Sequence, residues 1–227
     1  MTGSDGTQAD AQLPRPVSVL FVCLGNICRS PMAEGAFRNL THFGTAEHHP
    51  LIAKIDSCGT GAYHEGDTSD SRTMSVLRDN GITGYRHKAR KVTTEDFKQY
   101  DFVLGMDDEN VADLRDLVKR AAKKGSLTGE ESKKVFLYGA FGGKSVGEEI
   151  GDPYYGGRDG FTLAYEQVTR FGTGLLKHIE AMGLSIKYVI LRAATNGPDG
   201  TKETLHPGSD VINLILQGGT QCALSGS

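Results

Sequence analysis

Residues 17–30 read VSVLFVCLGNICRS, and this stretch decides the fold class. Its first part, Val17 to Val22, is an almost continuous apolar and β-branched run, which is typical of a strand buried on both faces of a parallel sheet. Ser30 then offers an N-cap and Pro31 a first helical residue. A strand that passes through a short loop into a helix predicts the start of a βαβ unit.

The chain repeats this alternation as far as residue 182. Further strands are expected at 51–56, 101–104 and 135–138, with helical patterns between and after them. The clearest helical stripe consists of Phe161, Ala164, Val168, Phe171, Leu175 and Ile179. We therefore predict a three-layer αβα fold of the α/β class, with a central four-stranded parallel sheet. It would be flavodoxin-like or Rossmann-like, with a phosphate loop after the first strand.

Two segments flank the predicted domain, which spans residues 16–182. Residues 1–15 are small and polar, so we expect a disordered leader. Residues 183–227 form a C-terminal extension rich in glycine. Its two apolar runs, 184–191 and 211–216, are either strands or parts of a poorly ordered tail, and the sequence assigns the extension no role.

Composition excludes several classes of protein. The 227 residues contain 25 Lys and Arg against 28 Asp and Glu, a net charge of -3, which does not favour nucleic acid or an anionic membrane surface as the main partner. No apolar run approaches the roughly 20 residues of a membrane span, and the N-terminus does not resemble a secretory signal. Four cysteines are too few for a disulfide scaffold. We expect a cytoplasmic monomer.

The loop after the first strand, residues 24–28, carries the candidate chemistry and is called the phosphate loop below. A loop folded over a helix N-terminus directs backbone N–H groups at an anion, and Gly25 and Asn26 tolerate the positive φ that such a loop needs. Arg29 adds a bidentate fork for phosphate. Cys23 lies at the base of this cup, where its nucleophilic thiolate is favoured. A bare Cys-x5-Arg match also arises by chance.

A zinc site is poorly supported by the cysteine spacing. Cys23 and Cys28 are separated by four residues, and the other two cysteines, Cys58 and Cys222, are distant in the sequence. This pattern does not make a zinc ligand set, so we expect no metal.

The run from Val19 to Glu34 resembles the signature of the low-molecular-weight protein tyrosine phosphatases. The segment Asp152-Pro153-Tyr154-Tyr155-Gly156 resembles the second half of that signature, and Asp56-Ser57, residues 87–90 and Met106-Asp107 are also similar to family segments. The resemblance covers residues 16–181 and is greatest to the eukaryotic branch. It implies hydrolysis of phosphotyrosine in proteins and of small aryl phosphates without a cofactor, and inhibition by phosphate-like anions.

The resemblance also implies a role for each signature residue. Cys23 would be the nucleophile that forms a phosphocysteine, and Arg29 would clamp the phosphate together with the amides of Leu24, Gly25, Asn26, Ile27 and Cys28. Asp152 would be the general acid and then the general base, because a tyrosine phenolate with a pKa of about 10 needs a proton as it leaves. Alone, Asp152-Pro153 would be a simple turn.

Other residues would support the loop or line its mouth. Asn26, Ser30, Ser57 and His87 match positions that hold the loop in shape, although His87 could also be a surface histidine. Tyr63, Tyr154 and Tyr155 would form an aromatic rim that favours phosphotyrosine over the shorter phosphoserine. His64 departs from the usual rim composition.

Related activities of the same fold fit the sequence less well. A bacterial arginine phosphatase resembles this loop but has threonine at the position of Ile27, and arsenate reductases of this fold need cysteines that are missing between Cys58 and Cys222. Family members with a similar pair of cysteines form a reversible disulfide that protects the nucleophile, so the resemblance implies the same for Cys23 and Cys28. Simple loop packing is the alternative for Cys28. Because Cys23, Arg29 and Asp152 are all present, an enzyme is favoured over a non-catalytic module that binds phosphotyrosine or another anion.

Overall fold

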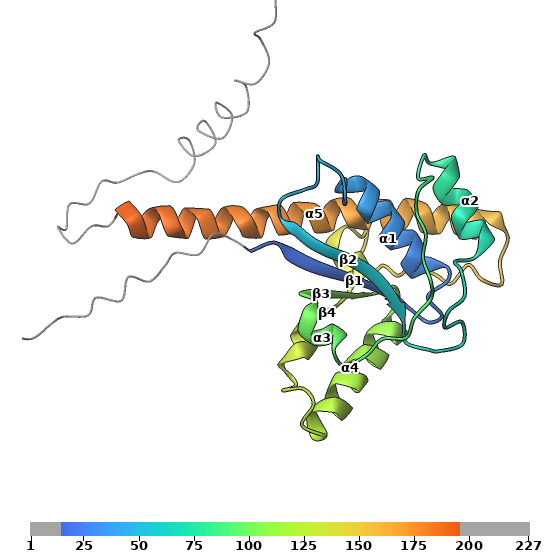
Figure 1. Ribbon diagram of the computed structural model, residues 1–227, viewed down its shortest axis with the longest axis horizontal. Helices are drawn as coiled ribbons and strands as arrows, with labels where there is room; N and C mark the ends of the chain where they lie inside the picture. The colour runs from blue at the N-terminus through green and yellow to red at the C-terminus, as the bar shows by residue number, and fades with distance from the viewer. Residues whose placement is uncertain (1–14, 196–227) are drawn as a thin grey trace, which may run out of the picture. The chain divides into compact units, whose positions relative to one another are not determined.

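The computed structural model describes the backbone of residues 15–195 and the side chains of residues 15–183. Strands and helices alternate along this part of the chain (Figure 1). In chain order the elements are β1 (Val17–Cys23), α1 (Arg29–Leu40), β2 (Ile52–Gly59), α2 (Ser71–Asp79), α3 (Asp96–Gln99), β3 (Phe102–Gly105), α4 (Asp108–Lys123), β4 (Val135–Leu137) and α5 (Arg158–Thr195), with short 3-10 turns on either side of β4.

The four strands form one parallel sheet in the order β2-β1-β3-β4. The chain moves from β1 to β2 on one side and then to β3 and β4 on the other, so the strand order reverses at β1. In open α/β sheets, ligands bind beyond the carboxyl ends of the strands at such a reversal. Since Cys23 is the last residue of β1, the phosphate loop leaves the sheet at this point.

Helices cover both faces of the sheet, which confirms the predicted αβα layers (Figure 1). Val19 and Phe21 of β1 belong to a hydrophobic cluster with residues of α1, α2 and α5, whereas Leu20 and Val22 belong to a second cluster with residues of α3 and α4. Successive side chains of a strand point to opposite faces, so an apolar run is what a strand with two covered faces requires.

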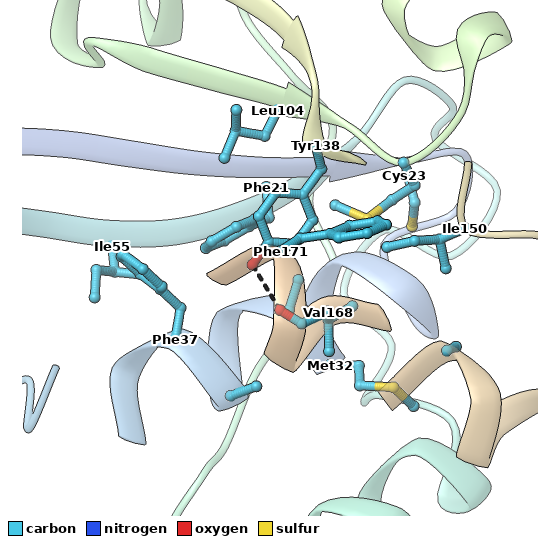
Figure 2. Packing of buried hydrophobic residues seen from close by; sticks show 14 of the residues in the cluster. Phe21, Cys23, Met32, Phe37, Ile55, Leu104, Tyr138, Ile150, Val168 and Phe171 are labelled. Atoms are coloured by element: carbon cyan, nitrogen blue, oxygen red, sulfur yellow. Dashed lines mark hydrogen bonds between the residues drawn. The ribbon is translucent and has the colours of Figure 1, made fainter. Parts of the chain in front are cut away.

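An aromatic group fills the first of these clusters close to the site (Figure 2). The ring of Phe21 contacts Phe37 of α1 and Tyr138 edge to face, at centroid distances of 5.6 and 5.0 Å. Tyr138 also contacts Phe171 of α5, and its hydroxyl donates to the carbonyl of Val168 at 2.9 Å. The buried hydroxyl therefore has a partner, and α5 is fixed against the strand that carries Cys23.

The start of α1 differs from the prediction. The helix begins at Arg29, with Cys28 in the cap position and no side-chain cap, so Ser30 lies inside the first turn and does not act as N-cap. Its hydroxyl instead lies 3.1 Å from the Cys23 sulfur. The capping pattern misled because a serine followed by proline fits the first turn equally well.

The segment after the predicted domain differs from one of its two predicted alternatives. The helix α5 runs without interruption to Thr195, so a strand at 184–191 is wrong. A short apolar run does not by itself distinguish helix from strand, and no proline follows Pro153 until Pro198. The predicted leader, apart from Arg15, and the apolar run 211–216 lie outside the described residues. Within the described part of the chain, no helix has the length and hydropathy that crossing a membrane requires.

Candidate active site

The first half of the phosphate loop is held through its backbone carbonyls. Those of Cys23 and Leu24 each accept a hydrogen bond at 2.9 Å, from the N–H groups of Thr60 and Gly61 respectively. In a trans peptide the carbonyl and the next N–H point in opposite directions. The N–H groups of Leu24 and Gly25 therefore point away from the segment after β2.

The second half of the loop is held in the same way by the N-terminus of α2. The carbonyl of Ile27 accepts from the N–H of Asp70 at 2.9 Å, and that of Cys28 accepts from the hydroxyl of Thr73 at 3.3 Å. The N–H groups of Cys28 and Arg29 are thereby turned away from α2. Four donors fixed in this way, next to the N-terminus of α1, make a site for an anion.

The sulfur of Cys23 lies at the base of this loop with two polar neighbours. The N–H of Asn26 donates to it at 3.3 Å, and the Ser30 hydroxyl lies 3.1 Å away. The side-chain amide of Asn26 donates to the same hydroxyl oxygen at 2.9 Å, which leaves the hydroxyl proton free to point at the sulfur or at the Cys58 carbonyl, 3.3 Å away. The backbone N–H of Asn26 and the hydroxyl of Ser30 are thus the polar neighbours of the Cys23 sulfur at the base of the loop.

Asn26 connects the loop to the structure beneath it. It has a φ of 56°, the left-handed conformation expected for this position, and it is 1% exposed. Its amide nitrogen also donates to Ser57 at 3.0 Å, and its carbonyl oxygen accepts from the backbone N–H of Arg90 at 2.9 Å and lies 2.8 Å from Nε2 of His87. Every hydrogen-bonding position of this side chain is used, so the loop has one well-defined shape.

A buried carboxyl group supports this network from below. Glu34 of α1 accepts from the hydroxyls of Ser57 and Tyr85, each at 2.8 Å, and lies 3.3 Å from Nδ1 of His87. Burial raises the pKa of Glu34 to about 7 and lowers the pKa of His87, so it disfavours the charged form of both groups. The side chain of His87 is 7% exposed, which excludes the surface alternative.

Arg29 is a buried cation with carboxylate partners. Its guanidinium donates to Asp107, to the carbonyl of Ile150 at 3.1 Å and to Asp152 at 3.1 Å. Burial lowers the pKa of Arg29, but the neighbouring Cys23 and the two carboxylates outweigh this effect and raise it, so the group stays charged. Asp107 also caps α4 by accepting from the N–H of Asn110 at 2.7 Å, which fixes it in place.

Asp152 belongs to residues 151–157, which we call the acid loop. One of its oxygens accepts from Arg29, and the other accepts from the N–H of Tyr154 at 3.1 Å. The side chain is 41% exposed, in contrast to the buried Arg29. Asp152 is therefore close to the loop that holds Cys23 and is also open to solvent.

Phosphate loop and acid loop share one cavity of about 390 Å³. Cys23, Arg29 and Asp152 all line it, so the structure brings together the three residues that the signature predicts. The predicted rim residues are there as well: the cavity is lined by Leu24, Gly25, Ile27, Cys28, Tyr63, His64, Tyr154 and Tyr155. An apolar mouth above a polar base suits a flat aromatic ring that carries an anion.

One group of side chains within the described residues has the spacing of a metal site. Ligand atoms of Glu34, Asp56 and His87 lie within 4.8 Å of one another. Each is already committed to protein partners, because Asp56 accepts from Arg90 and Tyr100 at 2.9 and 3.2 Å. The ligand atoms of all three side chains thus have protein partners, and these residues hold the site together.

The sequence predicts no individual role for four residues that contribute to the site, namely Glu34, Tyr85, Asp107 and Arg72. Asp107 had a usable signal, since it follows the third predicted strand just as Cys23 ends the first, and parallel strands end at the same edge of a sheet. Glu34 ends the run that resembles the family signature, but nothing in its local sequence assigns it a role. Tyr85 has no signal, because a buried hydroxyl partner of a carboxyl group cannot be told from a surface residue by sequence.

Fold and cavity together define an α/β phosphatase with an anion-binding loop at the end of its first strand. The profile of the family "Low molecular weight phosphotyrosine protein phosphatase" matches residues 18–183, and the chain belongs to that family. The fission yeast (Schizosaccharomyces pombe) enzyme of that name is 44% identical over 167 residues, which cover 74% of this chain and 99% of the yeast enzyme. Residues 184–227 lie outside the match.

Solved structures agree with this assignment. A protein tyrosine phosphatase from Entamoeba histolytica, crystallised with Hepes in its active site, is 33% identical, with a TM-score of 0.61 and coverage of 73% of this chain and 97% of its own. The Drosophila arginine phosphatase is 28% identical, with a TM-score of 0.60 and coverage of 71% and 96%. The protein is therefore a phosphatase enzyme.

Proposed function

We propose that the protein hydrolyses phosphotyrosine in proteins and peptides, and small aryl phosphates, through a phosphocysteine at Cys23. The observation that carries this proposal is the guanidinium of Arg29, which lines the cavity with the Cys23 sulfur and donates to Asp152 at 3.1 Å. A nucleophile, a phosphate-binding cation and a proton donor are thus available to one bound substrate.

In the first step, the Cys23 thiolate attacks phosphorus and the bond between phosphorus and the phenolic oxygen breaks. Asp152 gives its proton to that oxygen, so that a neutral phenol leaves. Arg29 and the loop N–H groups stabilise the charge on the remaining phosphoryl oxygens. In the second step, Asp152 takes a proton from water as the water attacks phosphorus, and the phosphorus–sulfur bond breaks to release phosphate and the thiolate.

The cavity walls support an aromatic substrate. Ile27 of the phosphate loop is 9% exposed and places an aliphatic group on the cavity wall, while Tyr63 and Tyr154 add aromatic surface to the same cavity. We expect phosphotyrosine to be a better substrate than phosphoserine, which is too short to reach Cys23, and than phosphoarginine. A phosphoarginine peptide turned over faster than its phosphotyrosine counterpart would contradict this expectation.

The decisive experiment measures hydrolysis of a phosphotyrosine peptide at mildly acidic pH without added metal. We expect turnover by the reduced wild type, none by Cys23→Ser and a strong reduction in Asp152→Ala. Binding of the phosphopeptide without turnover by the reduced wild type would instead indicate a binding module.

We also propose that peroxide inactivates the enzyme through a disulfide between Cys23 and Cys28, which thiols reverse. In this reaction peroxide oxidises Cys23 to a sulfenic acid, and the Cys28 sulfur then displaces water from it. Mass spectrometry of the peroxide-treated protein should find this disulfide. Sulfinic or sulfonic Cys23 alone would contradict it, and would leave Cys28 as a packing residue of the loop.

A further inference from the structure

The side chain of Arg72 links the acid loop to α2. Arg72 donates through Nε and Nη2 to the two oxygens of Asp70, at 3.0 and 2.8 Å, and through Nη1 to the carbonyl of Gly156 at 3.2 Å. Asp70 also caps α2 by accepting from the backbone N–H of Arg72 at 2.8 Å. The fork of the guanidinium therefore has a fixed direction, and its third donor reaches the acid loop.

Two aromatic rings hold the same guanidinium. Its central carbon lies 4.4 Å from the ring centroid of Phe161, a fully buried residue of α5, and 5.7 Å from that of Tyr154 in the acid loop. A planar cation between a carboxylate and aromatic rings loses little freedom when it makes one more hydrogen bond. Lysine could not reproduce this arrangement.

The N-terminus of α2 also holds the phosphate loop. As described above, Asp70 donates through its N–H to the Ile27 carbonyl, and Thr73 donates to the Cys28 carbonyl. The cap of this one helix is therefore in contact with both loops of the cavity. A shift of the acid loop relative to the phosphate loop would have to break the bond between Arg72 and Gly156.

We propose that Arg72 is a positioning residue that fixes the acid loop against the cap of α2, so that the carboxyl group of Asp152 stays aligned with the leaving oxygen of the substrate. This inference rests on the proposed role of Asp152 as the proton donor. Arg72 itself touches neither the Cys23 sulfur nor Asp152 in any contact described above, and it acts through the backbone of the acid loop.

Proton donation matters most when the leaving group is poor. The test therefore compares kcat/KM for phenyl phosphate, whose phenolate needs a proton, with kcat/KM for p-nitrophenyl phosphate, whose leaving group departs readily without one. We expect Arg72→Ala to lower kcat/KM about tenfold more for phenyl phosphate than for p-nitrophenyl phosphate, because small displacements of a catalytic group are costly. Arg72→Lys should not restore the lost activity.

A double variant tests whether Arg72 acts through Asp152. In an Asp152→Ala background, Arg72→Ala should cause no further selective loss on phenyl phosphate. Equal losses on the two substrates in the single variant, or the same selective loss without Asp152, would overturn the proposal. If Asp152→Ala alone showed no selectivity between the substrates, the role proposed for Asp152 would itself be wrong.

Two further variants test whether the effect is specific to the contact between Asp70 and Arg72. Asp70→Asn retains a good helix cap but removes the charge that holds Arg72, and it should shift the substrate ratio in the same direction. Arg158→Ala breaks an exposed ion pair to Asp79, which also links α2 to the segment after Asp152. It should leave the ratio unchanged, and an equal shift in this variant would count against a specific role for Arg72.

Discussion

Phosphate loop and acid loop line the same cavity but are built in opposite ways. The phosphate loop has its carbonyls bonded to neighbouring segments and its one asparagine fully satisfied at 1% exposure. The acid loop is held mainly by Arg29, Arg72 and short turn contacts, and Tyr155 within it is 96% exposed. The part proposed to bind the dianion is preorganised in full, whereas the part proposed to move a proton lies on the more exposed side of the cavity.

The firm structure of the phosphate loop should have its largest effect on the relative reactivity of the thiols of Cys23 and Cys28. Burial raises the pKa of Cys28 to about 12, and burial also raises the pKa of Cys58 well above that of a free thiol. At pH 8, only about 10⁻⁴ of the Cys28 side chains are therefore in the thiolate form. Alkylation needs the thiolate, so Cys28 should react slowly. Iodoacetate should modify Cys23 at least a hundredfold faster than Cys28, as peptide mapping over time would measure. Modification of Cys28 at a similar rate would mean that the phosphate loop opens readily.

The second prediction concerns Asn26, the residue at the centre of the phosphate loop. Asn26→Ala loses hydrogen bonds to Ser30, Ser57, His87 and Arg90 and places alanine in a left-handed conformation. We expect kcat/KM to fall about a hundredfold or more and the free energy of unfolding to fall by about 2–4 kcal/mol. Steady-state kinetics and denaturant unfolding measure the two effects. The exposed Asn39→Ala is the matched control and should change neither. A fully active Asn26→Ala would break the comparison between the loops.

The third prediction concerns the buried support of the phosphate loop. Because the pKa of Glu34 is about 7 in the folded protein and lower in the unfolded chain, the stability that its proton contributes is complete below pH 4.5. It is lost as the pH rises through 7, up to a limit of about 3 kcal/mol. Glu34→Gln should not show this loss, and unfolding of both proteins at pH 5 and pH 8 measures it. The same pH dependence in both proteins would mean that Glu34 is already ionised in the folded protein at pH 5.

The smallest effects should come from the acid loop rim. Tyr155→Ala removes an exposed ring and should change stability by less than about 0.5 kcal/mol. The ring of Tyr154 contacts the guanidinium of Arg72, and its centroid lies 6.2 Å from that of the His64 ring. Tyr154 and His64 both line the cavity, so Tyr154→Ala should raise KM for an aryl phosphate severalfold while changing stability little. Kinetics and thermal unfolding of the pair test this. A large loss of stability in either variant would show that the acid loop is as firmly built as the phosphate loop.

The sequence predicts those features that depend on neighbouring residues and misses those that depend on residues distant in the chain. The apolar run Val17–Val22 predicts a strand with both faces covered, because that property is local to the strand, and the parallel sheet follows from it. The helix start at Arg29 was missed because the conformation there depends on the bonds of Ser30 to Cys23 and Asn26. The continuation of α5 to Thr195 was missed because Gly183 and a short apolar run resemble the end of one element and the start of another.

The site shows the same division. Cys23, Arg29 and Asp152 could be named because they belong to short motifs with fixed spacing. The roles of Arg72 and Glu34 could not be predicted, because they depend on partners such as Gly156 and Tyr85, which are distant in the sequence. A single sequence gives no signal for such pairs, and only the folded arrangement brings them into contact.

The hydrogen bonds of the Asn26 side chain also affect its rate of deamidation. Deamidation requires the amide carbon of an asparagine to swing towards the following backbone nitrogen, and four partners hold this amide in place. The replacement of its nitrogen by oxygen would turn two donors to Ser30 and Ser57 into acceptors and add a negative charge beneath the thiol. The bonds that shape the loop for phosphate thus also protect it from the chemical damage that would abolish its shape.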